Sequence, residues 1–514
     1  MSKTIIIIGA GLAGLSAALQ AAENGCNVKL VSSLPSERAQ SVMAEGGINA
    51  ALNTKDENDS PEEHFTDTIK AACGLADPNA VWGMTQAAPE LVHWLLKLGV
   101  KFNMSGYDDV DLRNFGGQKK KRTAFAQSDT GKQIMTAMID AVRRKEASGM
   151  VERFSHHSFL TLRLCGNICC GCVIRDEYSQ ETVELPGDAV IVATGGMHGL
   201  FGNTTGSLSN TGEVTAELFR LGVPLANGEM IQYHPTTVKC GGKRMLISEA
   251  ARGEGGRLFA MKDGKQWYFM EEKYPELGNL MPRDITAREI WKVSHESEVF
   301  LDMTEISEEI ISNKLSGLAD DCMTYLHKDI RKEPVSVLPG IHYFMGGILV
   351  DEQHRTPIQN LYAAGECCAQ YHGANRLGGN SLLGALYGGR VAAKSACEQA
   401  DVVDLSCAIQ IDFPPASQIS EIKQLNKVMQ ETMGVVRNEN TLLNGIQTVQ
   451  ALTGNLPLLG MAVLKSALAR KESRGAHWRE DYPKSNDDDY LKTTVARFDG
   501  KQIQISFVPV PERR

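Results

Sequence analysis

Ile5-Ile6-Ile7-Ile8-Gly9-Ala10-Gly11-Leu12-Ala13-Gly14 is the stretch that decides the first unit of the fold. Its four isoleucines predict a strand that is buried on both faces of a parallel sheet. A helical pattern follows the glycines, Asn24-Gly25 ends it, and residues 27–31 predict a second strand. This order of strand, tight turn, helix and strand indicates an α/β fold with a dinucleotide-binding unit.

Each glycine of this stretch has its own physical reason. Gly9 permits the turn, Gly11 lets the backbone approach a pyrophosphate, and Gly14 lets the helix pack against the strand. The helix N-terminus then offers free N–H groups to the phosphates. The second strand ends in Ser32-Ser33, where an acidic residue usually binds the ribose, so the ribose contact is unassigned.

Two further glycine-rich elements lie far from the first. Residues 189–196 read AVIVATGG, and residues 361–366 read LYAAGE, with a helical stretch over 382–397. A nicotinamide dehydrogenase usually completes its nucleotide domain in one segment, whereas this discontinuous arrangement is typical of a flavoprotein with FAD. The alternative is that these are ordinary glycines at the ends of strands.

Length and composition limit the classes of protein to which the chain can belong. The chain has 514 residues, enough for about three domains. Its formal net charge of -9 argues against nucleic-acid binding. The apolar run at the start is short and broken by glycines, so we expect no signal peptide, no membrane span and a cytoplasmic location.

Seven motifs in order resemble the flavoprotein subunits of succinate dehydrogenase and fumarate reductase. They are RAQSVMAEGGI (38–48), QYHPT (232–236), SEAARGEGG (248–256), PRD (282–284), HYFMGG (342–347), HGANRLG (372–378) and SRGAHWRED (473–481). The set is specific, because it extends along almost the whole chain.

The resemblance implies a fold class and domain boundaries. We expect a Rossmann-like FAD-binding domain (1–235 and 342–405), an inserted α+β capping domain (236–341), a helical domain (415–472) and an irregular, polar tail (473–514). The residues agree locally, because Ile419, Ile422, Leu425 and Met429 have helical spacing.

The resemblance also implies the FAD site and one departure from it. Family members with covalent FAD carry a histidine at the position of Gln40, and glutamine cannot form that bond. We therefore expect noncovalent FAD with a lower potential, which favours fumarate reduction. Glu213 stands where the family usually has Asp. The residues expected to bind FAD are Gly9, Ala10, Gly11, Ala13, Gly14, Ser32, Gln40, Ser41, Ala44, Glu45, Gly46, Gly47, Ala193, Thr194, Gly195, Asn210, Thr211, Glu213, Gly365, Glu366, Arg376, Ser381 and Leu382.

Reduction of a C=C bond between two carboxylates requires donors that hold two anions and an acid that protonates carbon. Forked N–H donors match carboxylate geometry. By resemblance, one carboxylate is bound by His342 and Arg376, and the other by His234 and Ser248. The same resemblance implies that Gln232 and Phe115 line the pocket.

The resemblance makes Arg283 the proton donor, while FAD N5 delivers hydride. Arginine normally stays protonated, so it can act as an acid only if it is promptly reprotonated. Glu249 and Arg252 fit the family's proton path. Their i, i+3 spacing would place both on one face if that segment is helical.

No metal site is expected. Cys165, Cys169, Cys170 and Cys172 are close in sequence, but they lie among apolar residues around Gly166-Asn167. This pattern predicts a β hairpin rather than a cluster site.

Three other functions remain open at this stage. L-aspartate oxidase shares the fold and most of the dicarboxylate site. A related enoate reductase would act on an aryl or imidazole acrylate, and a noncatalytic flavin module would only relay electrons.

The resemblance implies a C4 dicarboxylate as substrate. It also implies an iron–sulfur subunit and membrane-anchor subunits as partners, which would hold the chain at the cytoplasmic face of a membrane; free-standing members exist as well.

Overall fold

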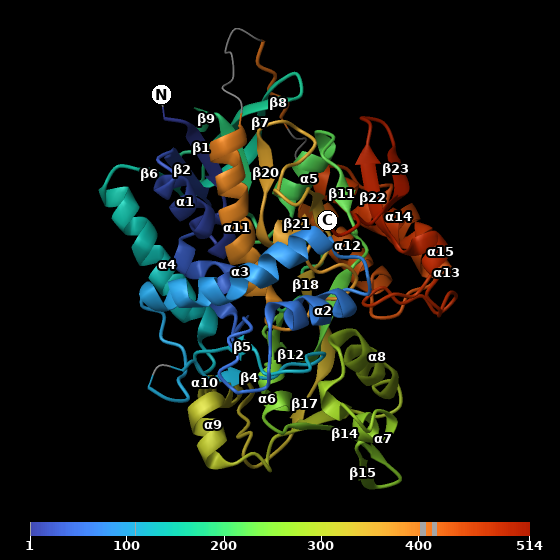
Figure 1. Cartoon of the computed structure of the whole chain (residues 1–514). Helices are drawn as coiled ribbons and strands as arrows, with labels where there is room; N and C mark the ends of the chain where they lie inside the picture. The colour runs from blue at the N-terminus through green and yellow to red at the C-terminus, as the bar shows by residue number, and fades with distance from the viewer. Residues whose placement is uncertain (1, 108, 401–407, 414–418) are drawn as a thin grey trace.

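The computed structural model describes residues 2–107, 109–400, 408–413 and 419–514. Residues 401–405 and 415–418, at the ends of two expected domains, lie outside this part of the chain. In Figure 1, a lower lobe formed by the middle of the chain lies beneath the N-terminal part. None of the described helices is both long and apolar enough to cross a membrane.

A parallel five-stranded sheet is the centre of the N-terminal part. Its strands, in spatial order, are β20 (Leu361–Ala363), β10 (Ala189–Val192), β1 (Thr4–Ile8), β2 (Asn27–Ser32) and β6 (Val151–Ser155). Ile5 and Ile7 face one hydrophobic core, and Ile6 and Ile8 face another. The strand is apolar throughout because both of its faces are buried.

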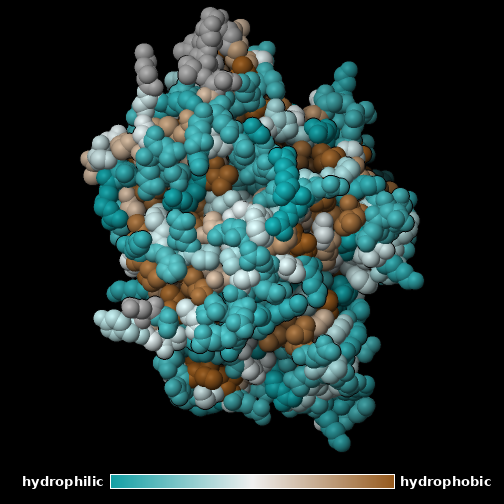
Figure 2. All heavy atoms as spheres, in the orientation of Figure 1, coloured by the Kyte–Doolittle hydropathy of each residue, from teal (hydrophilic) through white to brown (hydrophobic). Residues whose placement is uncertain are grey.

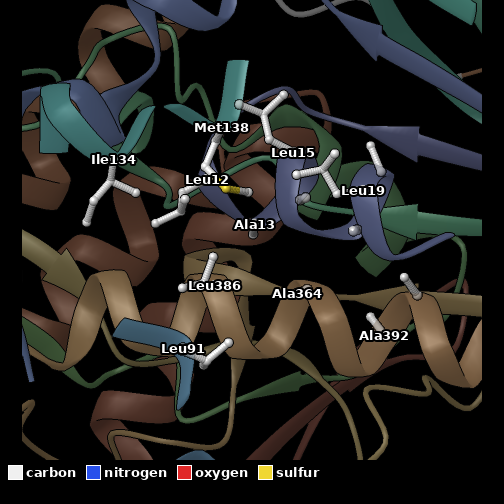
Figure 3. Packing of buried hydrophobic residues seen from close by; sticks show 14 of the residues in the cluster. Leu12, Ala13, Leu15, Leu19, Leu91, Ile134, Met138, Ala364, Leu386 and Ala392 are labelled. Atoms are coloured by element: carbon white, nitrogen blue, oxygen red, sulfur yellow. The ribbon is translucent and has the colours of Figure 1, made fainter. Parts of the chain in front are cut away.

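Helices cover one face of this sheet. They are α1 (Leu12–Glu23), α3 (Pro78–Lys97), α4 (Thr130–Ala147) and α11 (Asn380–Gln399). In Figure 3, Ala13 of α1 lies on the side of that helix that faces α11, whereas Leu15 and Leu19 lie on the side away from α11. A Cβ on Gly389 would lie 2.2 Å from the carbonyl oxygen of Ala13, so only glycine allows this close approach.

An antiparallel sheet covers the other face. It consists of β7 (His157–Cys165), β8 (Ile168–Asp176) and β9 (Thr182–Pro186). The turn between β7 and β8 contains Gly166, which confirms the predicted hairpin. Cys169 and Cys172 are buried in the core beneath β1.

The lower lobe of Figure 1 has a core of its own. One of its sheets contains β13 (Lys243–Leu246), β12 (Ile231–Cys240) and β18 (Leu338–Phe344). The other contains β15 (Lys265–Trp267), β14 (Arg257–Lys262), β16 (Val299–Asp302) and β17 (Val335–Ser336). The helices are α6 (Glu249–Gly253), α7 (Phe269–Lys273), α8 (Arg283–Val293), α9 (Glu308–Lys314) and α10 (Ser316–Asp321).

Three helices and a sheet form the C-terminal part. The helices are α12 (Ile419–Thr432), α13 (Glu439–Val449) and α14 (Asn455–Ala469), where helical spacing predicts them. The sheet contains β21 (Cys368–Ala369), β19 (Gly347–Leu349), β11 (Leu225–Ala226), β22 (Lys492–Phe498) and β23 (Ile503–Pro509). The expectation of an irregular tail is therefore wrong for 492–509, because β22 pairs with β11. The remaining elements are α2 (Pro61–Ala71), α5 (Glu213–Arg220), α15 (Asp487–Tyr490), β3 (Ile48–Asn49), β4 (Leu112–Arg113) and β5 (Thr123–Ala124).

A fully buried ion network connects this sheet to α14. Arg470 Nε donates to Glu229 Oε1 at 2.7 Å, and Arg470 Nη1 donates to Glu472 Oε1 at 2.7 Å. Arg470 Nη2 also donates to the Thr494 hydroxyl and to the Lys492 carbonyl on β22, both at 2.7 Å. The side chains of Arg470, Glu229 and Glu472 are 0% exposed, so the pairing compensates charges that water does not reach.

The face of the molecule in Figure 2 is mostly hydrophilic, with apolar atoms in small separate patches. Such scattered patches are normal for a folded protein.

Candidate active site

A cavity of about 1000 Å³ opens at the carboxyl ends of the parallel strands. Ile8, Val31, Ala193 and Ala364 stand there at the ends of β1, β2, β10 and β20 and line it. Ligands of open α/β sheets bind in this position. The volume is at the upper end of the range of about 300–1000 Å³ that is typical of cofactor sites.

The glycine-rich turn forms one wall of the cavity. Gly9 has a φ of 108°, and a Cβ there would lie 2.3 Å from the Ala193 carbonyl oxygen. A Cβ on Gly14 would lie 1.8 Å from the Gly9 carbonyl oxygen, so Gly14 allows the helix to touch the turn. Gly11 caps α1 without a side-chain hydrogen bond and faces the cavity. The geometry agrees with the turn expected at Gly9 and the helix packing expected at Gly14.

Almost all residues expected to bind FAD line this cavity. Gly14 is the exception, because it lies beneath the turn. The expected FAD-binding residues that do line the cavity are Gly9, Ala10, Gly11, Ala13, Ser32, Gln40, Ser41, Ala44, Glu45, Gly46, Gly47, Ala193, Thr194, Gly195, Asn210, Thr211, Glu213, Gly365, Glu366, Arg376, Ser381 and Leu382.

The donor set of the cavity fits FAD. The Ser32 hydroxyl at the end of β2 is buried and has no hydrogen-bond partner among the described residues. Its position beside the turn suits a ribose hydroxyl, and the glycine backbone suits a pyrophosphate. Gln40 also lines the cavity, and its Oε1 accepts a hydrogen bond from the Ser207 backbone N–H at 2.5 Å.

Sequence reasoning missed one end of the cavity, which is lined by His156, His157, Ser158, Glu177 and Tyr178. His156 has a φ of 58°, and its ring lies 5.1 Å from the Tyr178 ring. These residues come from the β7–β8 hairpin and its flanks and match no motif. The local feature that marks this end of the cavity is the positive φ of His156, which is unusual for a residue other than glycine. A backbone angle cannot be read from the sequence, so the sequence contains no sign of it.

The residues expected to bind a dicarboxylate meet on the other side of the cavity. His234 on β12 and His342 on β18 have ring centroids 5.2 Å apart, because the two strands pair. Ser248, the N-cap of α6, lines the cavity, as do Arg376 and Phe115. The structure thus brings together side chains that are far apart in sequence.

The electrostatics of this region favour an anion. Burial, and then the charge of Arg283, hold the pKa of His234 and of His342 well below the usual value, so both imidazoles are neutral. Burial and Arg283 lower the pKa of Arg376 to about 9, so it remains a cation at neutral pH. The buried Nε of Arg376 has no partner among the described residues.

Arg283, the first residue of α8, is held by two acceptors. Its Nε and Nη2 donate to Glu249 Oε2 at 2.8 and 2.6 Å, and its Nη1 donates to Gln232 Oε1 at 3.0 Å. Arg252 Nη2 lies 3.5 Å from Glu249 Oε1 on the same face of α6. Burial raises the pKa of Glu249, but Arg283 and Arg252 outweigh it and lower the pKa overall.

Gln232 does not line the cavity, in contrast to the expectation. It is fully buried, and its Nε2 donates to Asn375 Oδ1 at 2.9 Å and to the Arg376 carbonyl at 2.8 Å. The amide therefore joins Arg283 to the segment that carries Arg376. Arg252 likewise does not line the cavity.

Glu45 is an acidic residue in the wall of the cavity. Burial, and then the nearby charge of Asp321, raise its pKa to about 8. The carboxyl is therefore mostly protonated at neutral pH and adds little negative charge to the anion site. The described residues contain no group of acidic, histidine or cysteine side chains that could hold a metal ion.

Comparison with known proteins shows the family. The family described as "FAD binding domain" matches residues 4–382, and the family described as "Fumarate reductase flavoprotein C-term" matches residues 452–513. The succinate dehydrogenase flavoprotein subunit of Bacillus subtilis is 38% identical, over 100% of this chain and 98% of its own length. The chain belongs to the succinate dehydrogenase and fumarate reductase flavoprotein family.

Other members of the family are similar over the whole chain. The 8-methylmenaquinol:fumarate reductase flavoprotein subunit of Wolinella succinogenes is 32% identical, over 100% of this chain and 92% of its own length. The solved structure of E. coli quinol fumarate reductase FrdA superimposes with a TM-score of 0.90 and 27% identity. The superposition covers 99% of this chain and 97% of the FrdA chain.

Membership in the succinate dehydrogenase and fumarate reductase family confirms several expectations. The protein is an FAD-dependent oxidoreductase and a flavoprotein subunit of this type. The fold class is also confirmed: an α/β, Rossmann-like FAD-binding domain with an inserted capping domain and a C-terminal helical domain.

Proposed function

We propose that this flavoprotein reduces fumarate to succinate. The observation that carries the proposal is the set of cavity-lining cations and neutral donors around Arg283. His342, Arg376, His234 and Ser248 line the same cavity as Arg283. Together these donors suit the two carboxylates of a C4 diacid.

In this proposal, His342 and Arg376 hold one carboxylate, and His234 and Ser248 hold the other. Neutral imidazoles donate one N–H each, and Arg376 supplies a buried Nε that has no partner within the described part of the chain. Binding of one carboxylate by the Arg376 cation withdraws electrons from the alkene, which stabilises the negative charge that develops during the reduction. Phe115 closes the apolar side of the cavity.

Arg283 is the proposed proton donor to carbon. Its fixed contacts with Glu249 and Gln232 hold the guanidinium at one position on the cavity wall. Glu249 and Arg252 form the path by which Arg283 is reprotonated, because Glu249 contacts both arginines. FAD, when bound, supplies the hydride.

We further propose that FAD is bound noncovalently, because Gln40 offers no nucleophile for attachment. Acid precipitation of the purified holoprotein should therefore leave the pellet colourless and release all of the flavin into the supernatant. The measurement is the absorbance of both fractions near the flavin maximum. A yellow pellet would contradict the proposal.

The function is tested by turnover with an artificial low-potential electron donor. Fumarate should support oxidation of the donor, and succinate should be the product. An arylacrylate should not be reduced, because it has only one carboxylate. L-aspartate should not bleach the flavin; bleaching would favour L-aspartate oxidase.

We also propose that the chain works with an iron–sulfur subunit and membrane-anchor subunits at the cytoplasmic face of a membrane. The supporting observation is that the matched relatives are named as flavoprotein subunits. Native purification from membranes should recover an iron-containing subunit in a one-to-one ratio. A free-standing chain in the supernatant would contradict this.

A further inference from the structure

Thr205 lies in the loop after β10 and reaches the back of His342. Its hydroxyl lies 2.8 Å from His342 Nδ1, and its backbone N–H donates to the Ile341 carbonyl at 3.0 Å. The preceding Thr204 contacts His198 Nδ1 at 3.0 Å and the Gly206 N–H at 3.2 Å. The loop is therefore anchored on both sides of Thr205.

The distances favour donation from the Thr205 hydroxyl to His342 Nδ1. Its other acceptor, the Ile341 carbonyl oxygen, is 3.4 Å away. A hydroxyl donor prefers about 2.7–2.8 Å, so His342 Nδ1 at 2.8 Å is much the better acceptor. The His342 imidazole is neutral because it is buried beside Arg283 and Arg376, and it carries a single proton.

We propose that Thr205 is a positioning residue that fixes the tautomer of His342, so that its Nε2 carries the proton and faces the cavity. A carboxylate only accepts hydrogen bonds, so the opposite tautomer would present a lone pair to it and repel it. The inference rests on the proposed function, since it assigns to His342 a carboxylate ligand. Thr205 itself acts only through the imidazole.

The tautomer is measured directly in the holoprotein. With ¹⁵N-labelled histidine, the signal of His342, assigned by comparison with His342→Gln, should show a protonated Nε2 and an unprotonated Nδ1. Thr205→Val should change this signature, and Thr205→Ser should restore it. A protonated Nδ1 in the wild type, or an unchanged spectrum in Thr205→Val, would overturn the proposal.

Kinetics test the consequence. Thr205→Val should raise KM for fumarate about three- to tenfold, the factor that corresponds to one net hydrogen bond, with kcat within about twofold of the wild type. Thr205→Ser should recover the wild-type KM. Ser207→Ala removes a hydroxyl of the same loop that hydrogen-bonds to Ser209 and does not reach His342, so this variant should leave KM unchanged. An unchanged KM in Thr205→Val would also overturn the proposal.

Failure of this inference is distinguishable from failure of the proposed function. If the wild-type enzyme does not reduce fumarate, the proposed function is wrong, and the ¹⁵N spectrum still shows which nitrogen of His342 carries the proton. If the wild type turns over fumarate and the spectrum does not respond to Thr205→Val, only the inference falls.

Discussion

Replacing Arg283 with alanine is expected to lower kcat for fumarate reduction at least about 10³-fold. The variant loses both the proposed proton donor and a cation next to the substrate. Arg252, the nearest partner of Glu249 besides Arg283, does not line the cavity and is therefore not placed to protonate the substrate in its stead. Flavin absorbance should be retained, since Arg283 lies on the dicarboxylate side.

A matched control is available on the same helix. Arg288 stacks on the Trp478 ring at 4.0 Å, outside the cavity, so Arg288→Ala should keep turnover within about twofold. Steady-state assays on flavin-normalised samples make the comparison. If Arg283→Ala kept more than a tenth of the activity, Arg283 would not be the proton donor.

Replacing Arg470 with alanine is expected to reduce the free energy of unfolding of the C-terminal part by about 3–5 kcal/mol. The change leaves the carboxylates of Glu229 and Glu472 buried with fewer partners. It also removes two hydrogen bonds that connect α14 with β22. Chemical denaturation, followed by Trp fluorescence, measures the effect on the transition that includes this part of the chain.

Arg497 provides the control for this prediction. It lies on the same strand, β22, but is exposed, so Arg497→Ala should change the free energy by less than about 0.5 kcal/mol. A double-mutant cycle with Glu229→Ala should give a coupling of opposite sign to the single losses. If Arg470→Ala were as stable as Arg497→Ala, the network would contribute no net stability.

The sequence predicted the parts of the fold that depend on local chemistry. The isoleucine run and the glycine turn predict β1 and α1, because backbone geometry there leaves few alternatives. The motifs also predict which residues gather around Arg283. They do not distinguish the residues that line the cavity from those that lie behind the lining and hold it in place. Gln232 is the example, because the direction of its amide is set by Asn375 on a distant segment.

Other parts could not be predicted for different reasons. The hairpin of β22 and β23 did have a signal, since Asp499-Gly500 separates two alternating runs, but the polar composition concealed it. The contact between Thr205 and His342 had no signal, because it joins residues 137 positions apart. The pairing of Arg470 with Glu229 spans 241 positions and likewise depends on the assembled fold.

The order of strands in the parallel sheet has a consequence for biosynthesis. β20, the neighbour of β10, leaves the ribosome about 170 residues after it, which corresponds to roughly 10–30 s of translation. During that interval the edge of β10 lacks its native neighbour and is open to intermolecular pairing. The nascent polypeptide is therefore expected to need chaperone protection at this stage, and it acquires its yellow colour only once α11 has been synthesised.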